Sequence, residues 1–493
     1  MYYLGVDVGS SSIKIALVEM STGKSLGVVK EPAVEMAINA PKKDWAEQDP
    51  EEWWQHVCAG IRRIKEEFKV SDKVIKGIGI AYQMHGLVLI NKEGNTVRNA
   101  IIWCDSRAVE IGNLAYEKIG KEKCDTQLLN APGNFTASKL GWIKENEPKL
   151  FQKVYKFMLP GDYIAYRFSN TVNTTIPGLS EGIFWDFTTD QISDMVLDHF
   201  NFESDKFPEI VETFSRQCAV SDAGAQQSGL AAGTPILYRA GDQPNNALAL
   251  NVFHAGEVAA SAGTSGVLYA ITKSLSVKES SRLNNFAHVN YRAGREEKVG
   301  KLLCINGAGI QYRWLLNNLS VSSYEEMNQM AAEIEVGSEG VCVIPFGNGA
   351  ERMLNNAEVG THFINLNLNR HSKAHLCRAA LEGIAFSFVY GMEIMRDDGV
   401  DPKIIRAAND NLFRSEIFAM TIATLIGKEI EIFDTTGAIG AGRACVITES
   451  GYEAFSEYLG QDHLRTYTPL EEKTPYQIAY EHWKKELNLI INN

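Results

Sequence analysis

The sequence predicts an α/β fold divided into two domains. The chain has 493 residues, of which 45% are hydrophobic, and this is enough to build two sizeable cores. Short apolar runs alternate with amphipathic helical stretches in both halves, which is typical of α/β proteins. Two similar segments, LGVDVGSSSIKIALVE at 4–19 and GEVAASAGTSGVLYAI at 256–271, each predict a strand, a small-residue turn and a second strand. One segment lies in each half, so the sequence indicates a duplicated unit.

The first half begins with the hairpin expected over residues 4–19. An amphipathic helix is expected over 50–68, followed by apolar strands over 77–82 and 99–103. The run TPILY at 234–238 predicts another strand, and AGDQPNNALAL after it predicts a loop that leads into a helix. We place the domain boundary in this segment, which gives domains of residues 1–248 and 249–493.

The second half begins with the hairpin over 256–271, and helices are expected over 323–335 and 475–490. Each hairpin turn offers glycine, hydroxyl side chains and backbone N–H groups, a combination that binds phosphate. A plain turn is the alternative, because Asp7 and Gly9 suit turns of any function. In a duplicated chain the two turns would face each other across a cleft, and a nucleotide triphosphate could lie between them.

Composition limits the classes of partner. The net charge of −13 and the pI near 5.4 argue against nucleic acid or an anionic membrane as the main partner. The start of the chain shows no secretory pattern and no apolar run reaches membrane length, so we expect a cytoplasmic protein. Eight cysteines without a C-x-x-C pair argue against a disulfide framework or a zinc site. No P-loop or dinucleotide-binding motif is found, so the two turns are the candidates for phosphate binding.

Eight motifs carry a resemblance to a known family. They are DVGSSSIK, YQMHGLVL, IIWCDSR, FTASKLGWIKENEP, LPGDYIAYRFSN, AGD, SAGTSGVLY and HLCRAALEGIAF. In these motifs, which span nearly the whole chain, the sequence resembles the FGGY family of carbohydrate kinases, and within it the members that act on D-xylulose. The resemblance implies two domains of the actin-like, ribonuclease H-like ATPase fold with a cleft between them. It also implies transfer of the γ-phosphate of ATP, with Mg²⁺, to a sugar hydroxyl.

The resemblance assigns the catalytic base to Asp242 in RAGDQPNN, where a carboxylate would take the proton of the attacking hydroxyl. A helix N-cap is the alternative for this residue. Asp7, together with Asp242, would lie near Mg²⁺, an ion usually held by one or two carboxylates, waters and phosphates. For Lys14 the alternative is a solvated strand residue. The residues implied to face the phosphates are Ser10, Ser11 and Lys14 in the first turn and Gly263, Thr264 and Ser265 in the second.

For the sugar, the tetrapeptide QMHG implies that Met84 packs on the carbon face and that His85 hydrogen-bonds a hydroxyl. A core histidine is the alternative. The motif IIWCDSR places Trp103, Asp105 and Arg107 near the sugar, although a strand-end turn with a surface ion pair would also explain Asp105. Gln243, where the family commonly has Asn, is a further expected sugar contact.

The adenosine contacts implied by the resemblance are Ala407, Ala408 and Asn411 in IIRAANDNLFRSEIF. The two alanines stand where many members of the family have glycines. Gly307 completes the set of residues expected to bind the nucleotide.

Three functions remain open from the sequence. The first is a ketopentose kinase that converts D-xylulose and ATP to D-xylulose 5-phosphate and ADP. The second is the same chemistry on another polyol, such as L-ribulose, L-fuculose or glycerol. The third is a non-catalytic, actin-like nucleotide-binding protein, which would need neither Asp242 nor QMHG. The expected partners are therefore a small sugar and ATP, and the sequence leaves a homodimer undecided.

Overall fold

The computed structural model describes residues 1–295 and 298–492 and contains two large mixed sheets. The first sheet has the strand order β13-β14-β5-β1-β2-β3. Its strands β14, β5 and β1 are parallel, β2 pairs antiparallel with β1, and β3 pairs antiparallel with β2. The bounds are β1 Tyr2–Val8, β2 Ile13–Glu19, β3 Ser25–Glu31, β5 Ile75–Tyr82, β13 Phe214–Ala219 and β14 Pro235–Gly241.

The second sheet repeats this arrangement, with the order β17-β18-β16-β15-β21-β22-β23. Here β15, β21 and β22 are parallel, and β16 and β18 continue antiparallel from β15. The hairpin β15–β16 therefore takes the place that β1–β2 has in the first sheet, and the prediction of a hairpin in each half is confirmed. The bounds are β15 Glu257–Ala262, β16 Gly266–Thr272, β17 Asn284–Ala287, β18 Val299–Ile305, β21 Ile404–Ala408, β22 Ile430–Phe433 and β23 His463–Tyr467.

Three predicted helices are present. α1 (Pro50–Glu67) begins after Asp49, whose side chain accepts a hydrogen bond from the backbone N–H of Glu51, and it buries its apolar face against β2 and β3. α12 (Tyr324–Ala332) and α17 (Thr474–Ile491) match the other two predictions. The strand expected over 99–103 is reduced to β7, because only Ala100–Ile101 pair with β4.

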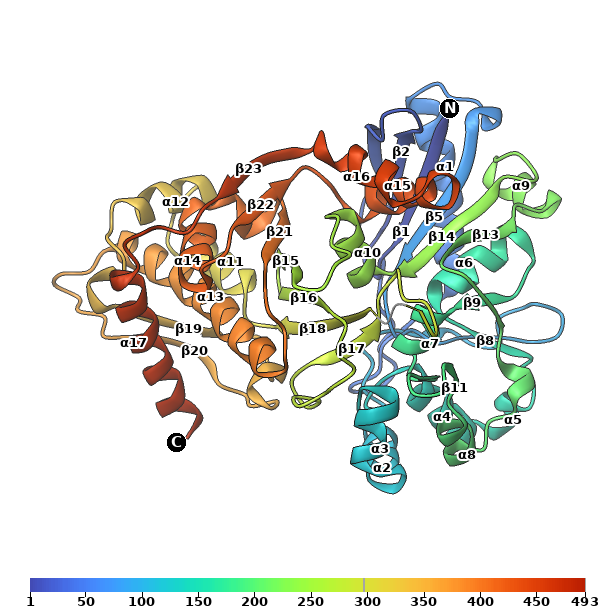
Figure 1. Cartoon of the computed structure of the whole chain (residues 1–493), viewed down its shortest axis with the longest axis horizontal. Coiled ribbons are helices and arrows are strands. Elements are labelled where there is room, and N and C mark those ends of the chain that lie inside the picture. The colour runs from blue at the N-terminus through green and yellow to red at the C-terminus, as the bar shows by residue number, and fades with distance from the viewer. Residues whose placement is uncertain (296–297, 493) are drawn as a thin grey trace.

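Two helices join the two units. α10 (Asp242–Ala249) packs against α15 (Gly437–Ser450), and α15 lies on β1 and β5 of the first sheet (Figure 1). A Cβ atom added to Gly5 would lie 1.8 Å from the carbonyl oxygen of Ala438, so glycine is required for this close approach. A helix from the second half of the sequence thus covers a sheet of the first half. These contacts cross the boundary placed at residue 248, which stays a prediction.

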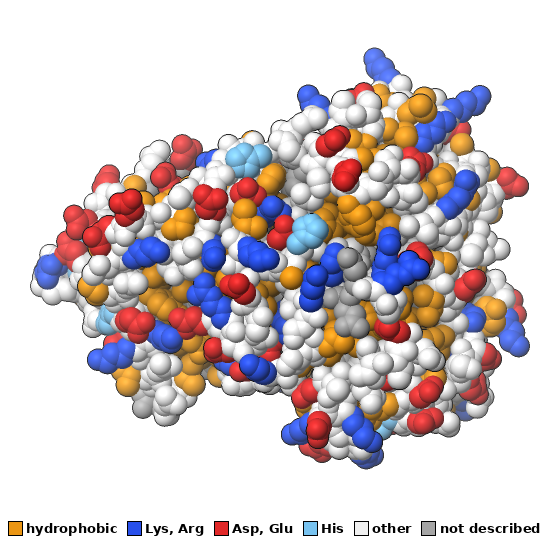
Figure 2. Space-filling view, in the orientation of Figure 1, with side chains coloured by type: hydrophobic (Ala, Val, Ile, Leu, Met, Phe, Trp, Pro, Cys, Tyr) orange, Lys and Arg blue, Asp and Glu red, His pale blue; other side chains and the backbone are white. Residues whose placement is uncertain are grey.

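A smaller lobe of the first half, between β5 and β13, meets the second sheet at α7 (Ile176–Glu181) and β17, and one apolar cluster is shared by both. On the face shown in Figure 2, acidic and basic side chains are interspersed over most of the surface. Within the described residues no helix is both long enough and apolar enough to cross a membrane. The other elements are β4 Glu47–Gln48, β6 Val88–Ile90, α2 Val109–Ile119, α3 Lys121–Lys123, α4 Thr136–Asn146, α5 Pro148–Phe151, β8 Lys156–Met158, α6 Pro160–Ser169, β9 Asn173–Thr175, β10 Trp185–Asp186, β11 Gln191–Ile192, α8 Asp194–Phe200, β12 Glu209–Val211, α9 Asp222–Ser228, α11 Gly309–Asn318, β19 Cys342–Phe346, β20 Gly360–Ile364, α13 Lys373–Asp397, α14 Glu416–Ile426 and α16 Tyr452–Gly460.

Candidate active site

Asp242 lies at the point where β14 ends and α10 begins. It is the first residue of the helix, and the N-cap position is held by Gly241, so the N-cap alternative does not describe it. Burial, together with the nearby Asp7 carboxyl, raises the pKa of the Asp242 carboxyl to about 7. At neutral pH this group is therefore poised to accept a proton.

Asp7 and Lys14 face each other across the β1–β2 hairpin. They are directly paired in the register, and Lys14 Nζ is 3.7 Å from Asp7 Oδ2. Burial raises the pKa of the Asp7 carboxyl, whereas Lys14 opposes this rise. Asp7 also lies beside the start of α15, because a Cβ atom on Gly437 would be 3.2 Å from its Oδ2. The hairpin turn is closed by a hydrogen bond from the Gly9 N–H to the Ser12 carbonyl, 3.1 Å.

Asp7 and Asp242 form a pair of carboxyls that fits Mg²⁺. The residues that the structure describes contain no group of three or more His, Cys, Asp or Glu placed to hold a metal ion. Mg²⁺ does not need such a group, because it commonly takes one or two carboxylates and completes its shell with water and substrate phosphates. Two neighbouring half-buried carboxyls, each with a raised pKa, would be stabilised as anions by a divalent cation.

His85 is held in one tautomer by the backbone. Its Nδ1 lies 3.0 Å from the carbonyl oxygen of Glu181, which can only accept, so Nδ1 carries the proton and Nε2 keeps a lone pair. Burial, together with the buried Lys139, lowers the pKa of His85 to about 3. The imidazole is therefore neutral and offers an acceptor to a substrate hydroxyl.

Met84 and Glu181 connect this histidine to the base. A Cβ atom on Gly241, the residue before Asp242, would lie 2.6 Å from Met84 Cγ and 2.7 Å from Glu181 Oε2. Burial raises the pKa of the Glu181 carboxyl well above its usual range, and Asp242 adds to the rise. Gln83 is also buried, and its amide atoms have no hydrogen-bond partner within the described chain. Sequence reasoning missed Glu181 and Gln83, although Gln83 is the first residue of the QMHG motif.

The three predicted sugar residues of the IIWCDSR motif divide into two groups. Trp103 is 53% exposed and its indole N–H lies 3.3 Å from the Ser10 hydroxyl, so it joins the first turn. Asp105 is fully buried, and its carboxylate accepts hydrogen bonds from the Ala46 N–H at 2.6 Å and from the Arg107 guanidinium at 2.6–2.9 Å. Arg107 lies over the ring of Trp45, 3.7 Å from its centroid. The structure therefore favours an ion pair for Asp105 and Arg107, buried rather than at the surface.

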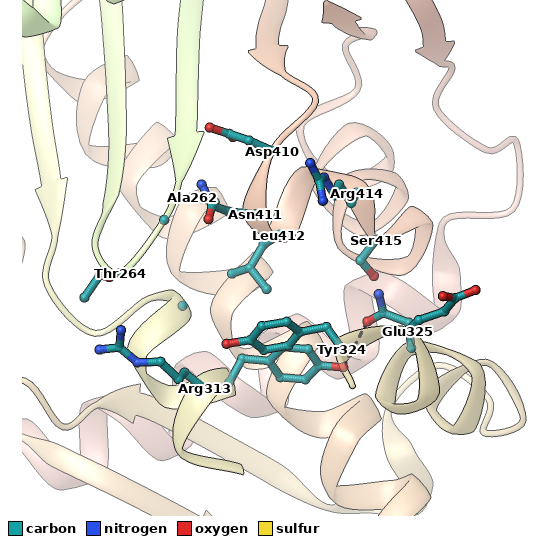
Figure 3. Close-up of a pocket in the computed structure, with 14 residues that line it drawn as sticks. Ala262, Thr264, Arg313, Tyr324, Glu325, Asp410, Asn411, Leu412, Arg414 and Ser415 are labelled. Carbon is teal, nitrogen blue, oxygen red and sulfur yellow. Dashed lines mark hydrogen bonds between the residues drawn. The ribbon is translucent and has the colours of Figure 1, made fainter. Parts of the chain in front are cut away.

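The second hairpin turn lies on the start of α11. The carbonyls of Gly263 and Thr264 accept hydrogen bonds from the N–H groups of Gly309 and Ile310 at 3.0 and 3.1 Å. A cavity of about 670 Å³ opens beside the turn, a size that suits a nucleotide-like ligand. It is lined by Ala262, Gly263, Thr264, Gly309, Tyr312, Arg313, Tyr324, Glu325, Asn328, Asp410, Asn411, Leu412, Arg414 and Ser415. In Figure 3 the side chains of Asn411 and Leu412 lie on one side of the cavity and the ring of Tyr324 on the other.

The predicted adenosine residues are only partly brought together. Asn411 lines the cavity, 3.6 Å from where a Cβ of Gly263 would lie. Ala407 and Ala408 lie on β21, which leads to the cavity, but neither is among the lining residues. Gly307 is used structurally: its N–H donates to Glu351 Oε1 at 2.6 Å, and a Cβ there would be 2.4 Å from the Pro345 carbonyl.

Sequence reasoning missed the aromatic side of the cavity. Tyr312 and Tyr324 stack with centroids 5.9 Å apart, and the Tyr312 hydroxyl donates to Asn328 Oδ1 at 3.0 Å. Gln311, in the first turn of α11, is buried and its amide has no hydrogen-bond partner among the described residues, but it does not line the cavity. The segment 323–335 showed only a helical period, so nothing in it indicated a binding role.

Comparisons with known proteins point to one family. The model of the N-terminal domain of the FGGY family of carbohydrate kinases matches residues 2–249, and that of the C-terminal domain matches residues 258–447. A xylulose kinase of Escherichia coli strain K12 is 26% identical over 462 residues, covering 93% of this chain and 92% of its own length. The crystal structure of a xylulose kinase from Rhodospirillum rubrum covers all of both chains with a TM-score of 0.87 at 22% identity. A Plasmodium falciparum glycerol kinase with ADP has the same TM-score at 19% identity, covering 99% of this chain and 98% of its own. The expected two-domain α/β kinase fold with a cleft is confirmed.

Proposed function

Because the chain belongs to the FGGY family of carbohydrate kinases and is a sugar kinase, we propose that its phosphoryl acceptor is a ketopentose, with D-xylulose as the first candidate. The relatives named xylulose kinase align over most of this chain, which favours this acceptor over others. A glycerol kinase shares the fold at 19% identity. Glycerol, L-ribulose and L-fuculose are the alternative acceptors to test.

One arrangement carries the proposal. Asp242 is electrostatically coupled to Asp7, which pairs with Lys14, and it follows Gly241, which lies against Met84 and Glu181, the residue whose carbonyl binds His85. A base between a phosphate-binding hairpin and a neutral hydrogen-bond acceptor is what transfer to a hydroxyl requires. A sugar kinase needs both groups, because the hairpin binds the phosphates and the acceptor binds the sugar.

In the proposed reaction the sugar hydroxyl attacks the γ-phosphorus of ATP. Asp242 accepts the hydroxyl proton as the O–P bond forms and the bond between the γ-phosphorus and its bridging oxygen breaks, which releases ADP. Lys14 and the N–H groups and hydroxyls of the turns at Ser10–Ser11 and Gly263–Ser265 neutralise and orient the phosphates. His85 Nε2 accepts a hydrogen bond from a second sugar hydroxyl, and Met84 packs on the carbon face.

We infer that Mg²⁺ is held by Asp7 and Asp242 together with phosphate oxygens and water. When bound, the ion supplies positive charge to the β- and γ-phosphates. The adenosine part of ATP would occupy the cavity beside Asn411. A cytoplasmic location and a homodimer remain predictions.

A coupled assay of ADP release with the purified protein tests the proposal. D-xylulose, L-ribulose, L-fuculose, glycerol and gluconate are each offered with MgATP, and kcat/KM is compared. We expect D-xylulose to give the highest value. A higher value for another acceptor would replace D-xylulose, and no turnover with any acceptor would count against the site assignment.

A further inference from the structure

Strand β17 lies at the edge of the second sheet, and its other side meets the first half of the chain. Its strand partner is β18, with Asn284 opposite Leu302 and Ala287 opposite Val299. The side away from β18 meets α7 of the small lobe (Figure 1). A short strand of the second half of the chain thus packs against the first half.

Two buried asparagines fix the register of this contact. The Asn285 N–H donates to Asn130 Oδ1 at 2.8 Å, and Asn285 Nδ2 donates to the Leu129 carbonyl at 2.9 Å. In return, Asn130 Nδ2 donates to the Asn285 carbonyl. Both asparagines are fully buried, so sliding the strand would leave several polar groups without partners.

The same contact reaches the residue that orients His85. The Ala287 N–H donates to the Ser180 hydroxyl at 2.9 Å, and the next residue, Glu181, offers the carbonyl that binds His85 Nδ1. Two adjacent residues at the end of α7 therefore hold β17 and the histidine ring. Any shift of β17 acts on the backbone that sets the tautomer of His85.

Phe286, between these two anchors, lies against the imidazole itself. Its ring centroid is 5.2 Å from that of His85 at an interplanar angle of 44°, and Phe135 packs edge-on against His85 at 4.7 Å. Phe135 comes from the first half of the chain and Phe286 from the second, so the histidine is held between the two halves. Phe286 is 1% exposed, and its effect on a ligand would therefore pass through His85.

We propose that Phe286 is a positioning residue for the sugar-binding histidine, and that sugar binding depends on β17 being seated on α7. This inference rests on the proposed function, in which His85 contacts the sugar. It adds that the second half of the chain supplies part of the sugar site as well as the nucleotide site. Sugar affinity is then sensitive to the contact between the halves.

Kinetics of Phe286→Ala, compared with Phe207→Ala, test the proposal. Phe207 is a buried phenylalanine of the same apolar cluster that packs on Phe157 and Phe184 at 4.9 and 5.0 Å. We expect Phe286→Ala to raise the KM for the sugar about tenfold and to leave the KM for ATP within about threefold, with Phe286→Leu in between. Phe207→Ala is expected to lower the melting temperature without this selective change. Equal effects of Phe286→Ala and Phe207→Ala on sugar KM would overturn the proposal.

A double-mutant cycle separates a positioning role from general destabilisation. If Phe286 acts through His85, Phe286→Ala should change the sugar KM less than about twofold in a His85→Asn background. If the free-energy effects of the two substitutions on sugar binding are fully additive in the double variant, the proposal is contradicted.

NMR of ¹⁵N-labelled histidine gives a readout that needs no substrate. In the wild type the His85 imidazole should stay neutral with the proton on Nδ1 down to about pH 5, because burial holds its pKa near 3. In Phe286→Ala we expect its pKa to rise toward the ordinary value, with Phe286→Leu showing a smaller change. An unchanged His85 signal would overturn the inference even if no sugar is phosphorylated, whereas failure of every sugar in the panel would overturn only the proposed function.

Discussion

Asp7 and Lys14 are directly opposite in the β1–β2 ladder, and the charges on their side chains are 3.7 Å apart. The same lysine opposes the rise that burial causes in the pKa of Asp410, a residue of the second half that lines the cavity beside the second hairpin turn. One cation therefore serves carboxyls from both halves of the molecule. A phosphate group that binds between the two halves would meet the positive charge of Lys14 there.

Replacing Lys14 by Met is expected to weaken MgATP binding. Loss of a charged hydrogen-bond donor to phosphate should raise the KM for MgATP roughly tenfold and leave the sugar KM nearly unchanged. Lys30→Met is the matched control, because Lys30 pairs with Lys14 in the β2–β3 register and lies one strand farther from Asp7. Steady-state kinetics of the two variants give the comparison, and equal effects would support the solvated-strand alternative for Lys14.

Asp242→Asn is expected to keep the fold and sugar binding while losing most turnover. General-base catalysis is worth roughly 10²–10⁴-fold, so kcat should fall by that factor. Calorimetric titration with the sugar and circular dichroism check binding and fold. A variant with near-normal kcat would remove Asp242 from the role of base.

The pH profile tests the same carboxyl. Since Asp242 must be ionised to accept a proton, kcat/KM for MgATP, which reports the enzyme before the metal binds, should fall as the pH drops through about 7. The pKa is raised from 3.8 in the folded protein, so the folded state binds this proton more tightly than the unfolded state does. The carboxyl therefore costs stability above about pH 4, and most above about pH 7. Asp242→Asn should raise the melting temperature at pH 8 more than at pH 4, and the opposite order would contradict the assignment.

Gly263→Val is expected to block the nucleotide cavity. A Cβ at this position would lie in ordinary contact with Asn411, so Gly263→Ala should be tolerated, while the branched valine would fill space beside the turn. We expect the Kd for MgATP to rise at least about tenfold for the valine variant, with a change of less than about twofold for the sugar. Separate calorimetric titrations measure both, and equal losses for the two ligands would count against a nucleotide site here.

Substitution of His85 is expected to affect the sugar. Removing its Nε2 acceptor leaves a sugar hydroxyl unpaired, at a cost of about 1–3 kcal/mol, which corresponds to roughly a ten- to hundredfold loss in kcat/KM. ATP hydrolysis without sugar should change little. Because His85 has a φ of 62°, alanine would add backbone strain, and His85→Asn is the better variant since asparagine tolerates this conformation. A lower melting temperature with unchanged sugar kinetics would indicate a core histidine.

Asp105→Asn is expected to destabilise the protein without changing its specificity. The substitution removes one partner of a buried ion pair and should cost about 3 kcal/mol. Glu47, 2.7 Å from the same Arg107 nitrogen, limits the loss by retaining one partner. Urea unfolding and sugar KM are measured on one preparation. A raised sugar KM at unchanged stability would return Asp105 to the sugar site.

Local patterns predicted much of the fold. The hairpins β1–β2 and β15–β16 and helices α1, α12 and α17 follow from hydrophobic period and turn chemistry, which depend on neighbouring residues only. The positions of α15 on the first sheet and of β17 on α7 depend on pairs of surfaces far apart in the sequence. No local pattern carries that information, so these contacts could not be predicted.

The same distinction between local patterns and long-range contacts applies to the candidate site. Asp242 and His85 could be proposed from the sequence because their motifs are short and contiguous, and their roles stay predictions. Glu181 escaped because its role depends on a carbonyl meeting His85 across the lobe. For Asp105 the sequence allowed both an ion pair and a sugar contact. What decided between them was the aromatic cover over Arg107 from Trp45 and Trp142, which are distant in sequence from each other.

The position of α15 on β1 and β5 has a consequence for how the protein is made. Gly5 leaves the ribosome long before Ala438, which covers it, is translated. Until then the growing chain exposes the apolar face that α15 later covers, and domain-by-domain folding cannot finish the first sheet. The nascent protein is therefore a candidate for chaperone binding throughout translation, and splitting the gene at the junction of its halves would leave the first product without its covering helix.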